Sequence, residues 1–342
     1  MHPKDSSKAT ATSDEPTRGN SRPDFGSRLI AGSIRPAVHT ATEPDCVLRL
    51  DRPGSYYLDR ALAAQAGKHG IVITASHVSL DLNGYAVSGC PGSRSGIVVL
   101  AETGVVIRNG SVHGWGEHGI DASACVGALI DTVRSTDNLG DGLRLGPNSS
   151  ADAIRACDNA GNGIALAAGG TLHDCTSMTS GECGILAAES CRLIDCSASA
   201  NTCDGINAGA GSTIRACTAR HNLGAGIVAQ RLSTISECDV IKNESDGVRV
   251  ESDCNILRSR CHGSRRGAGI HATGQSNRID ENTCTENRVG IIAIQAGNII
   301  CRNALSASAD AAIEAAAGNH VGRLLAKPEA VRTELPWSNV IL

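Results

Sequence analysis

A glycine followed by Ile, Leu or Val recurs at a nearly constant interval through most of this 342-residue chain. The glycines are Gly96, Gly119, Gly142, Gly163, Gly184, Gly205, Gly226, Gly247, Gly269 and Gly290. Their nine intervals span 194 residues, so the mean period is about 21.6 residues. A repeat of this length is typical of a solenoid, in which each coil buries its apolar face only by stacking on its neighbours. The repeat therefore predicts one elongated domain.

The unit from 226 to 246 indicates how one coil is built. Ile227 and Ala229 share one face of a short strand, Ile235 begins a second strand, and Val240 belongs to a third. Since side chains alternate between the two faces of a strand, all of these residues point inward only if the chain bends between the strands. The pattern predicts a triangular coil of three short strands.

Four cysteines keep step with the repeat. Cys175, Cys196, Cys217 and Cys238 are 21 residues apart, each nine residues before a repeat glycine. The chain has fifteen cysteines, an odd number, and no Cys-x-x-Cys motif. We expect these four to be buried as small hydrophobic residues. Disulfides between coils, and metal or redox chemistry, are the alternatives.

A second column consists of asparagine. Asn138, Asn159, Asn201, Asn222 and Asn243 each lie four residues before a repeat glycine, and Ser180 fills the same position in one coil. Asn tolerates left-handed backbone conformations, and its amide hydrogen-bonds in both directions. We therefore expect a structural column at a bend.

These motifs resemble those of the right-handed parallel β-helix proteins of the pectate-lyase-like superfamily. The segments 53–89 and 108–120, and the ending after 318–322, resemble a bacterial group of such proteins without a firmly assigned activity. The resemblance implies an all-β, right-handed parallel β-helix of about 10–12 coils with three short strands per coil. It also implies that the outer face of the Gly-aliphatic sheet is where enzymes of the superfamily bind a glycan.

The chain divides into four expected segments. Residues 1–40, rich in Ser, Thr, Pro and mixed charge, are expected to be a disordered leader. Residues 41–95 are expected to form an N-terminal cap and the first coils, with a short capping helix at 61–66. Residues 96–322 are expected to form the regular β-helix, and 323–342 an irregular C-terminal cap or arm. This tail, with Trp337, is a candidate contact for a homo-oligomer.

Composition limits the partners. The formal net charge of −4 disfavours nucleic-acid binding. No run reaches the roughly 20 apolar residues that span a bilayer, so no membrane partner is expected. The first thirty residues lack the apolar stretch of a secretory signal, which predicts a cytoplasmic protein unless a signal has been removed. No cofactor is predicted.

The residue after each aliphatic anchor is predicted to face outward. This row consists of Asp121, Arg144, Ala165, Leu186, Asn207, Val228, Arg249, His271 and Ile292. The position before the glycine adds Asp141, Asp204 and Asp246. Polar residues gather at two ends of the row. Since Arg144 and Arg249 are five coils apart, roughly 24 Å by strand spacing, they define two separate candidate sites.

The N-terminal candidate site surrounds the segment HGWGEHG. Its residues are His113, Trp115, Glu117, His118, Asp121, Asp141 and Arg144. Trp115 is predicted to stack on a sugar or another flat apolar surface. Glu117 or a histidine, with His118 as the candidate, is predicted to move a proton, and Arg144 to neutralise a carboxylate. The alternative is structural: Trp115 covers the first coils and the charges are solvated.

The C-terminal candidate site contains Arg249 and His271 on adjacent coils, with Asp246, Arg265 and Arg266 nearby. β-Elimination or C5 epimerisation of a uronate needs a base and cations, so Arg249 and His271 suit that chemistry as catalytic residues. The alternative is a surface ion pair between Asp246 and Arg249. Asp204 and Asn207, between the two ends, complete the predicted substrate-binding residues.

Three functions remain open. The first is a carbohydrate-active enzyme of lyase or epimerase type acting on an acidic saccharide. The second is a non-catalytic β-helix that serves as a binding or structural module, since active sites usually lie on loops that depart from the repeat. The third is a cytoplasmic enzyme for a small molecule. Because Asp141, Asp204 and Asp246 are not on adjacent coils, no tightly bound metal is predicted.

Overall fold

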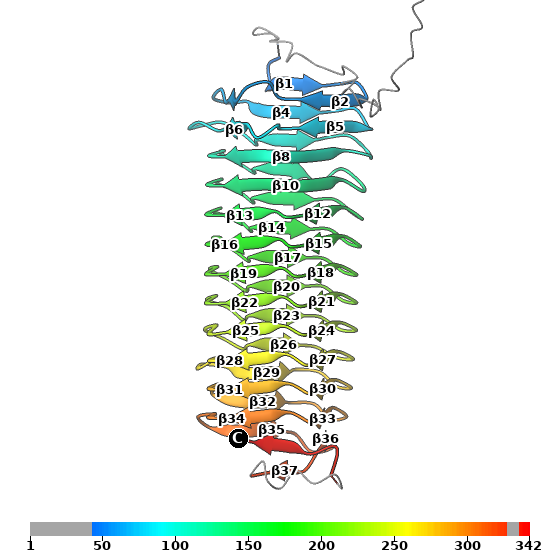
Figure 1. Ribbon diagram of the computed structural model, residues 1–342, viewed down its shortest axis with the longest axis vertical. Helices are drawn as coiled ribbons and strands as arrows, with labels where there is room; N and C mark the ends of the chain where they lie inside the picture. The colour runs from blue at the N-terminus through cyan, green and yellow to red at the C-terminus, as the bar shows by residue number, and fades with distance from the viewer. Residues whose placement is uncertain (1–42, 327–334) are drawn as a thin grey trace, which may run out of the picture. The chain divides into compact units, whose positions relative to one another are not determined.

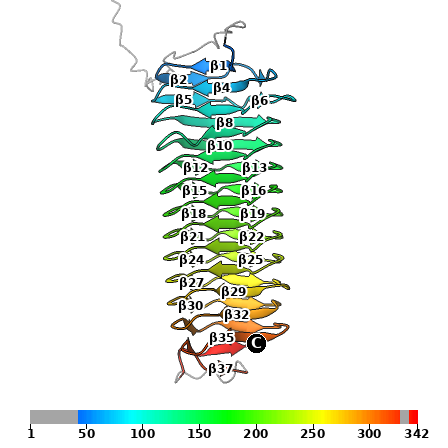
Figure 2. The ribbon, with the colours of Figure 1, turned by 180° about the vertical axis from the view of Figure 1, so that it is seen from behind.

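The computed structural model describes residues 43–326 and 335–342, which form a parallel β-solenoid (Figure 1). The predicted leader, 1–40, lies outside the described residues. The view from the opposite side (Figure 2) shows the same stack of short strands from β1 to β37. The described residues contain no helix long and apolar enough to cross a membrane.

Sheet A carries the Gly-aliphatic pairs and has thirteen parallel strands, one per turn. In spatial order they are β1 (Cys46–Leu50), β4 (His69–Ile73), β7 (Ile97–Val99), β9 (Ile120–Ala122), β11 (Leu143–Leu145), β14 (Ile164–Leu166), β17 (Ile185–Ala187), β20 (Ile206–Ala208), β23 (Ile227–Ala229), β26 (Val248–Val250), β29 (Ala268–Ala272), β32 (Val289–Ala293) and β35 (Ala311–Ala315). The predicted outward row from Asp121 to Ile292 is a continuous series of register partners. The register prediction is confirmed.

The other two sides of each coil belong to sheet B, which has two columns of strands. The first column is β2 (Gly54–Tyr57), β5 (Val78–Asp81), β8 (Val106–His113), β10 (Leu129–Thr136), β12 (Ser150–Asp152), β15 (Thr171–His173), β18 (Arg192–Ile194), β21 (Thr213–Arg215), β24 (Thr234–Ser236), β27 (Asn255–Leu257), β30 (Arg278–Asp280), β33 (Ile299–Cys301) and β36 (His320–Val321). The second column is β3 (Leu62–Ala63), β6 (Ala86–Ser88), β13 (Arg155–Cys157), β16 (Thr176–Met178), β19 (Ser197–Ser199), β22 (Thr218–Arg220), β25 (Asp239–Ile241), β28 (Arg260–His262), β31 (Thr283–Thr285), β34 (Ala304–Ser306) and β38 (Asn339–Ile341), with β37 (Leu324–Leu325) paired to β38. The longer strands β8 and β10 run through both columns. Three strands per coil is therefore the rule.

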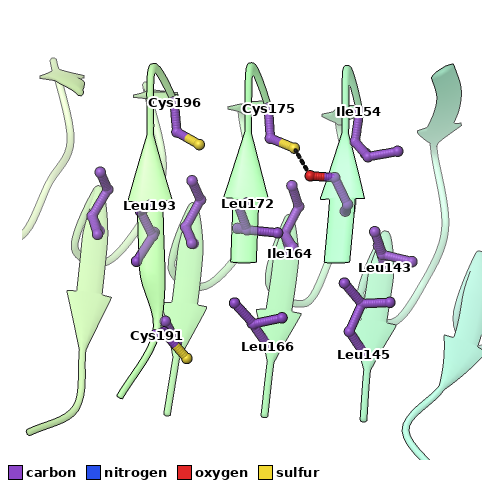
Figure 3. Packing of buried hydrophobic residues seen from close by; sticks show 14 of the residues in the cluster. Leu143, Leu145, Ile154, Ile164, Leu166, Leu172, Cys175, Cys191, Leu193 and Cys196 are labelled. Carbon is purple, nitrogen blue, oxygen red and sulfur yellow. Dashed lines mark hydrogen bonds between the residues drawn. The ribbon is translucent and has the colours of Figure 1, made fainter. Parts of the chain in front are cut away.

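The core is a narrow stack of aliphatic side chains. Ile227, Ile235 and Val240, from the three sides of one coil, are fully buried. The four cysteines 21 residues apart are at most 2% exposed. In Figure 3, Ile154, Cys175 and Cys196 occupy the same place in successive turns, and Cys175 Sγ donates to the carbonyl of Ala151 at 3.6 Å. All fifteen cysteines lie in the described residues as free thiols.

The asparagine column is buried and hydrogen-bonded along the solenoid. The backbone and side-chain N–H groups of Asn222 both donate to Asn243 Oδ1, at 3.0 and 2.9 Å. The sequence suggested that these asparagines adopt the left-handed conformation. In the structure the residue before each asparagine adopts it instead. Ala200, His221 and Lys242 have φ values of 56°, 56° and 50°. The asparagine is thus selected for its amide and not for its backbone.

The repeat glycine is required by the close approach of the next coil. A Cβ built at Gly226 would lie 2.6 Å from Asn243 Nδ2 and 2.7 Å from the carbonyl oxygen of Gly247. That carbonyl accepts the N–H of Ile227 at 2.9 Å. A side chain at this position would therefore collide with the coil that the backbone bonds to.

Two expectations about the ends were wrong. Residues 61–66 form no helix, because six residues are too few to sustain one alone and Leu62 instead pairs with Val87 of the next coil. The turns number about thirteen and not 10–12. The additional turns lie at the two ends, outside the regular repeat. Strand β1 lacks a Gly-aliphatic pair, β4 carries Gly70 at an irregular interval, and β35 has Ala312 in the glycine position.

The C-terminal end is partly regular. Within the predicted irregular tail, 327–334 lie outside the described residues, but β38 pairs with β34. Asn339 Oδ1 accepts the backbone N–H of Asn303 at 2.9 Å, which extends an asparagine column. Trp337 is 59% exposed, with the Arg302 guanidinium 5.0 Å from its ring centre. Homo-oligomer formation through this tail stays a prediction.

Candidate functional site

The residues immediately before the repeat glycines, here called the pre-glycine column, have a shared structural role. In several coils their side chain accepts the backbone N–H of the corresponding residue in the next coil. The pairs are Ser95 N–H to His69 Nδ1 (3.2 Å), Asp141 N–H to His118 Nδ1 (2.9 Å), Asn162 N–H to Asp141 Oδ1 (2.7 Å), Ala225 N–H to Asp204 Oδ1 (2.8 Å) and Ala268 N–H to Asp246 Oδ1 (2.8 Å). One atom of each such side chain is thus committed to the fold, and only the other is left for contacts with neighbouring side chains or a ligand.

A cleft of about 390 Å³ opens on the outer face of sheet A near its N-terminal end. This N-terminal cleft is lined by Asp45, His69, Val72, Arg94, Ser95, Val98, Leu100, Glu117, His118 and Asp121. Three of the predicted site residues, Glu117, His118 and Asp121, therefore lie together. His69, Arg94, Ser95 and Asp45 join them without having been predicted.

The two histidines of the N-terminal cleft have fixed tautomers. Nδ1 of each ring accepts a backbone N–H, so in the neutral ring the proton is on Nε2. His69 Nε2 makes no hydrogen bond within the described residues. Burial, together with the nearby Arg94 guanidinium, lowers the pKa of His69 below its usual value, which favours the neutral ring. Both rings consequently present an N–H donor and not a basic lone pair.

Glu117 is held as a carboxylate. Its two oxygens accept the Ser95 hydroxyl at 3.0 Å and Arg94 Nε at 3.3 Å. Burial raises the pKa of Glu117, but these two donors outweigh burial and leave the pKa below its ordinary value. Glu117 is therefore ionised at neutral pH and accepts hydrogen bonds in the cleft.

Arg144 lies beside the cleft and is loosely paired. Its Nε is 3.4 Å from Asp141 Oδ2, and its Nη1 is 3.8 Å from Asp121 Oδ2. Asp121 is already bonded to the Ser123 hydroxyl at 2.6 Å. Arg144 Nη1 also lies 3.1 Å from His118 Nε2. Because that nitrogen bears a proton, two donors face each other there, and an oxygen acceptor placed between them would satisfy both.

On its other side Arg144 borders a more apolar hollow of about 370 Å³. The floor of this hollow includes Leu145, Ala165 and Leu186, and Leu186 is 40% exposed. Arg144 thus separates a polar cleft from an apolar strip along the same face of sheet A.

The C-terminal candidate residues form a closed cluster. Asp246 Oδ2 accepts Arg249 Nε at 2.8 Å and His271 Nδ1 at 3.0 Å, and Arg249 Nη2 donates to the Ser245 hydroxyl at 3.0 Å. Burial opposes ionisation of Asp246, but the His271, Ala268 and Arg249 donors lower its pKa to about 2. His271 Nε2 is buried and has no hydrogen-bond partner in the described part of the chain. Arg249 is thus paired with Asp246, as the structural alternative in the sequence analysis expected.

Other predicted residues lie elsewhere. Trp115 is fully buried, and its indole N–H donates to the Val87 carbonyl at 3.0 Å, so the prediction that it stacks on a sugar was wrong. His113 ends strand β8 in sheet B and bonds Ser88 at 3.0 Å, outside the cleft. Arg265 and Arg266 border a separate hollow with Lys242.

Asp204 and Asn207 lie between the two ends of the outer face of sheet A. Asn207 Nδ2 donates to Asp204 Oδ2 at 3.0 Å. No Lys, Arg or His lies within 4.0 Å of the Asp204 carboxylate anywhere in residues 43–326 and 335–342. Asp204 begins an Asp-Gly-aliphatic segment like those that begin at Asp141 and Asp246. Its fourth residue is the amide Asn207, where the other two segments have an arginine.

The chain matches the model of a family described as "Right handed beta helix region" over residues 69–222 and 205–323, well over half of its length. It belongs to the right-handed β-helix family. No curated protein matches the sequence.

Among solved structures, this β-helix is similar to the Dettilon tailspike protein, with 15% identity and a TM-score of 0.51 over 87% of the chain. It spans 60% of the tailspike chain. It is also similar to the periplasmic alginate epimerase AlgG, with 12% identity and a TM-score of 0.54, over 80% of this chain and 77% of that one. At these identities the likeness shows the fold alone.

Two clusters of candidate metal ligands converge in the described part of this β-helix. Glu43, Asp45 and Cys46 form one, but Arg49 occupies it, with Nη2 2.6 Å from Asp45 and Nε 3.0 Å from Glu43. The other consists of Cys183, Cys203 and Asp204. Each cluster includes at least one thiol and neither provides three carboxylates, so neither fits calcium, which takes oxygen ligands.

Proposed function

We propose that the chain binds an acidic saccharide on the outer face of sheet A, with the N-terminal cleft and Arg144 as the site. The observation that carries the proposal is the state of Arg144. Its side chain is 40% exposed, no carboxylate of the described residues is closer than 3.4 Å, and one of its N–H groups faces another donor, His118 Nε2. A sugar carboxylate at this point accepts from both and forms the charge-assisted contact that Arg144 lacks.

The rest of the cleft suits hydroxyl groups. His69 and His118 offer N–H donors, while Glu117 and Asp121 offer carboxylate oxygens with unused lone pairs. Saccharide hydroxyls both donate and accept, so they use both kinds of group. The carboxylates here are already paired with Ser95, Arg94 and Ser123, which limits their repulsion of an acidic ligand.

The apolar hollow beyond Arg144 supports an extended ligand. A sugar ring has apolar C–H faces, and Ala165 and Leu186 give it a flat apolar surface without an aromatic ring. A chain of several sugars lying along sheet A would therefore place its carboxylate at Arg144, its hydroxyls in the cleft and a neighbouring ring on the hollow. This role replaces the one predicted for Trp115.

A lyase or epimerase activity is the second candidate, and one observation favours it. Asp246 accepts from His271 Nδ1, which leaves the basic lone pair on Nε2, where no described residue uses it. An Asp-oriented histidine is a suitable base for removing the proton next to a sugar carboxylate. This chemistry requires a movement that uncovers His271, because Nε2 is buried. Arg249 would also have to turn from Asp246 and Ser245, which its Nε and Nη2 bond, to contact a substrate with those groups.

The test is a panel of oligosaccharides given to the purified protein. Uronate oligomers, with alginate included because a structural neighbour is an alginate epimerase, are compared with neutral oligomers of equal length by calorimetry. We expect binding of at least one uronate series, weakened by salt, and weaker binding of its neutral counterpart. Failure of every uronate oligomer to bind would refute the proposal.

The same panel separates catalysis from binding. Absorbance from unsaturated products identifies a lyase, and uptake of solvent deuterium at C5 identifies an epimerase. Binding without either signal supports the non-catalytic module, and binding of monomers alone supports a small-molecule protein.

A further inference from the structure

Two thiols and a carboxylate from adjacent coils meet on the outer side of the solenoid. Cys183 lies just before β17, and Cys203 and Asp204 lie just before its neighbour β20 (Figure 1). The two Sγ atoms and a carboxylate oxygen of Asp204 all lie within 4.8 Å of one another. Backbone bonds from Cys203 N–H to the Glu182 carbonyl (3.2 Å) and from Gly184 N–H to the Asp204 carbonyl (3.0 Å) hold the coils on either side.

The negative charge of this cluster has no cationic partner among residues 43–326 and 335–342. Asp141 has Arg144 and Asp246 has Arg249, whereas Asp204 is bonded only by neutral groups, the Ala225 N–H at 2.8 Å and Asn207 Nδ2 at 3.0 Å. The other cluster, Glu43 with Asp45 and Cys46, does have a cationic partner, because Arg49 pairs with both of its carboxylates. Only the Cys183 cluster, of the two in the described chain, therefore combines convergent ligands with an uncompensated carboxylate.

We propose that Cys183, Cys203 and Asp204 bind one zinc ion. Two thiolates and a carboxylate are a ligand set that a divalent ion of borderline softness prefers, and a water completes a tetrahedron. Two sulfurs on one tetrahedral zinc are about 3.8 Å apart, so the ligand atoms need to approach by at most about 1 Å. On binding, each thiol releases a proton to solvent, and Zn²⁺ replaces the two protons.

The surroundings suit this ion. Cys203 is exposed, which gives an ion access, whereas Cys183 is only 7% exposed and fixed in the coil. The Ala225 N–H and the Asn207 amide hold both oxygens of Asp204 in place and leave lone pairs for the metal. The bound ion would join two coils near the middle of sheet A, away from the N-terminal cleft.

Cobalt substitution tests the proposal in the full chain, kept reduced with a phosphine. Titration with Co²⁺ alone is expected to produce thiolate-to-cobalt charge-transfer absorption that saturates at one ion per chain and disappears when Zn²⁺ is added. Competition with a chromophoric chelator gives the zinc affinity. Removing a group that only orients a ligand costs about 10–100-fold in metal affinity, so Cys203→Ser and Asp204→Asn should each lose at least that much.

The matched control is Cys157→Ser, which removes a half-buried thiol on another side of the coil and should leave the cobalt spectrum and affinity unchanged. Asp204→Asn retains an acceptor for the Ala225 N–H, and Cys203 is exposed, so both variants should fold, as circular dichroism would verify. Absence of the charge-transfer band in the parent protein would overturn the proposal. So would a band and affinity that Cys203→Ser leaves unchanged.

Discussion

Two parts of the solenoid, five coils apart, carry the same short pattern but hold its arginine differently. The segments are Asp141-Gly-Leu-Arg144 and Asp246-Gly-Val-Arg249. In both, one aspartate oxygen accepts a backbone N–H from the next coil, at 2.7 and 2.8 Å. The other oxygen is 3.4 Å from Arg144 Nε in the first segment and 2.8 Å from Arg249 Nε in the second.

The difference comes from the neighbouring coils and not from the pattern itself. The register partner of Arg249 is His271, which shares the Asp246 carboxylate and closes the cluster. The partner of Arg144 on the same side is Ala165, and on the other side the His118 ring presents a donor to it. One local motif therefore yields a closed ion cluster or a loosely paired arginine, depending on the side chains one coil away.

The largest expected effect is on stability, where the two aspartates should differ. Asp246→Ala leaves His271, Arg249 and the Ala268 N–H without their acceptor, which should cost about 3 kcal/mol of unfolding free energy. Asp141→Ala strands the Asn162 N–H but removes only a long contact to Arg144, 3.4 Å from its Nε, so about 1.5 kcal/mol is expected. Urea unfolding followed by circular dichroism measures both. Equal losses would show that the two segments are energetically alike.

Acid should weaken the C-terminal cluster over a defined range. The folded pKa of Asp246 is about 2, below its ordinary value of 3.8, so its contribution is complete above about pH 4 and is lost as pH falls towards 2. At 1.36 kcal/mol for each pKa unit, the loss is about 2 kcal/mol. Unfolding of the parent protein and of Asp246→Asn at several pH values should show a shallower acid slope in the variant. Parallel slopes would contradict the assigned role of the cluster.

Much of the fold could be predicted from the sequence because every regular coil needs a glycine where the next coil approaches closely, which makes the repeat visible. The outward row was predicted residue by residue, and the structure confirms its register. Trp115 could also have been placed inward, since it stands four residues before Gly119, the position of the asparagine column. Its backbone N–H donates to Asn138 Oδ1 at 3.1 Å, as the backbone N–H groups of that column do. The aromatic side chain of Trp115 suggested a surface that binds sugar, but the position of Trp115 in the repeat places it in the core.

The site was less predictable. His69 and Arg94 were missed because 26 residues separate Gly70 from Gly96, which breaks the regular interval that located the other coils. Cys183 lies one residue before Gly184, whereas Cys203 lies two residues before Gly205 on the adjacent coil. The two thiols therefore do not share a position in the repeat, and the repeat spacing does not predict that they meet. The tautomer of His118 and the pairing of Arg144 depend on side-chain directions in neighbouring coils, which no spacing rule contains.

The most direct test compares the two arginines in ligand binding. The tightest uronate oligomer of the panel is titrated calorimetrically into the parent protein, Arg144→Gln and Arg249→Gln, with circular dichroism to verify folding. A charge-assisted hydrogen bond is worth about 1.5–3 kcal/mol, so Arg144→Gln should weaken binding by roughly tenfold or more, while Arg249→Gln should leave the affinity within about twofold of the parent. Loss of binding in Arg249→Gln, with Arg144→Gln unchanged, would contradict the account and place the site at the C-terminal cluster.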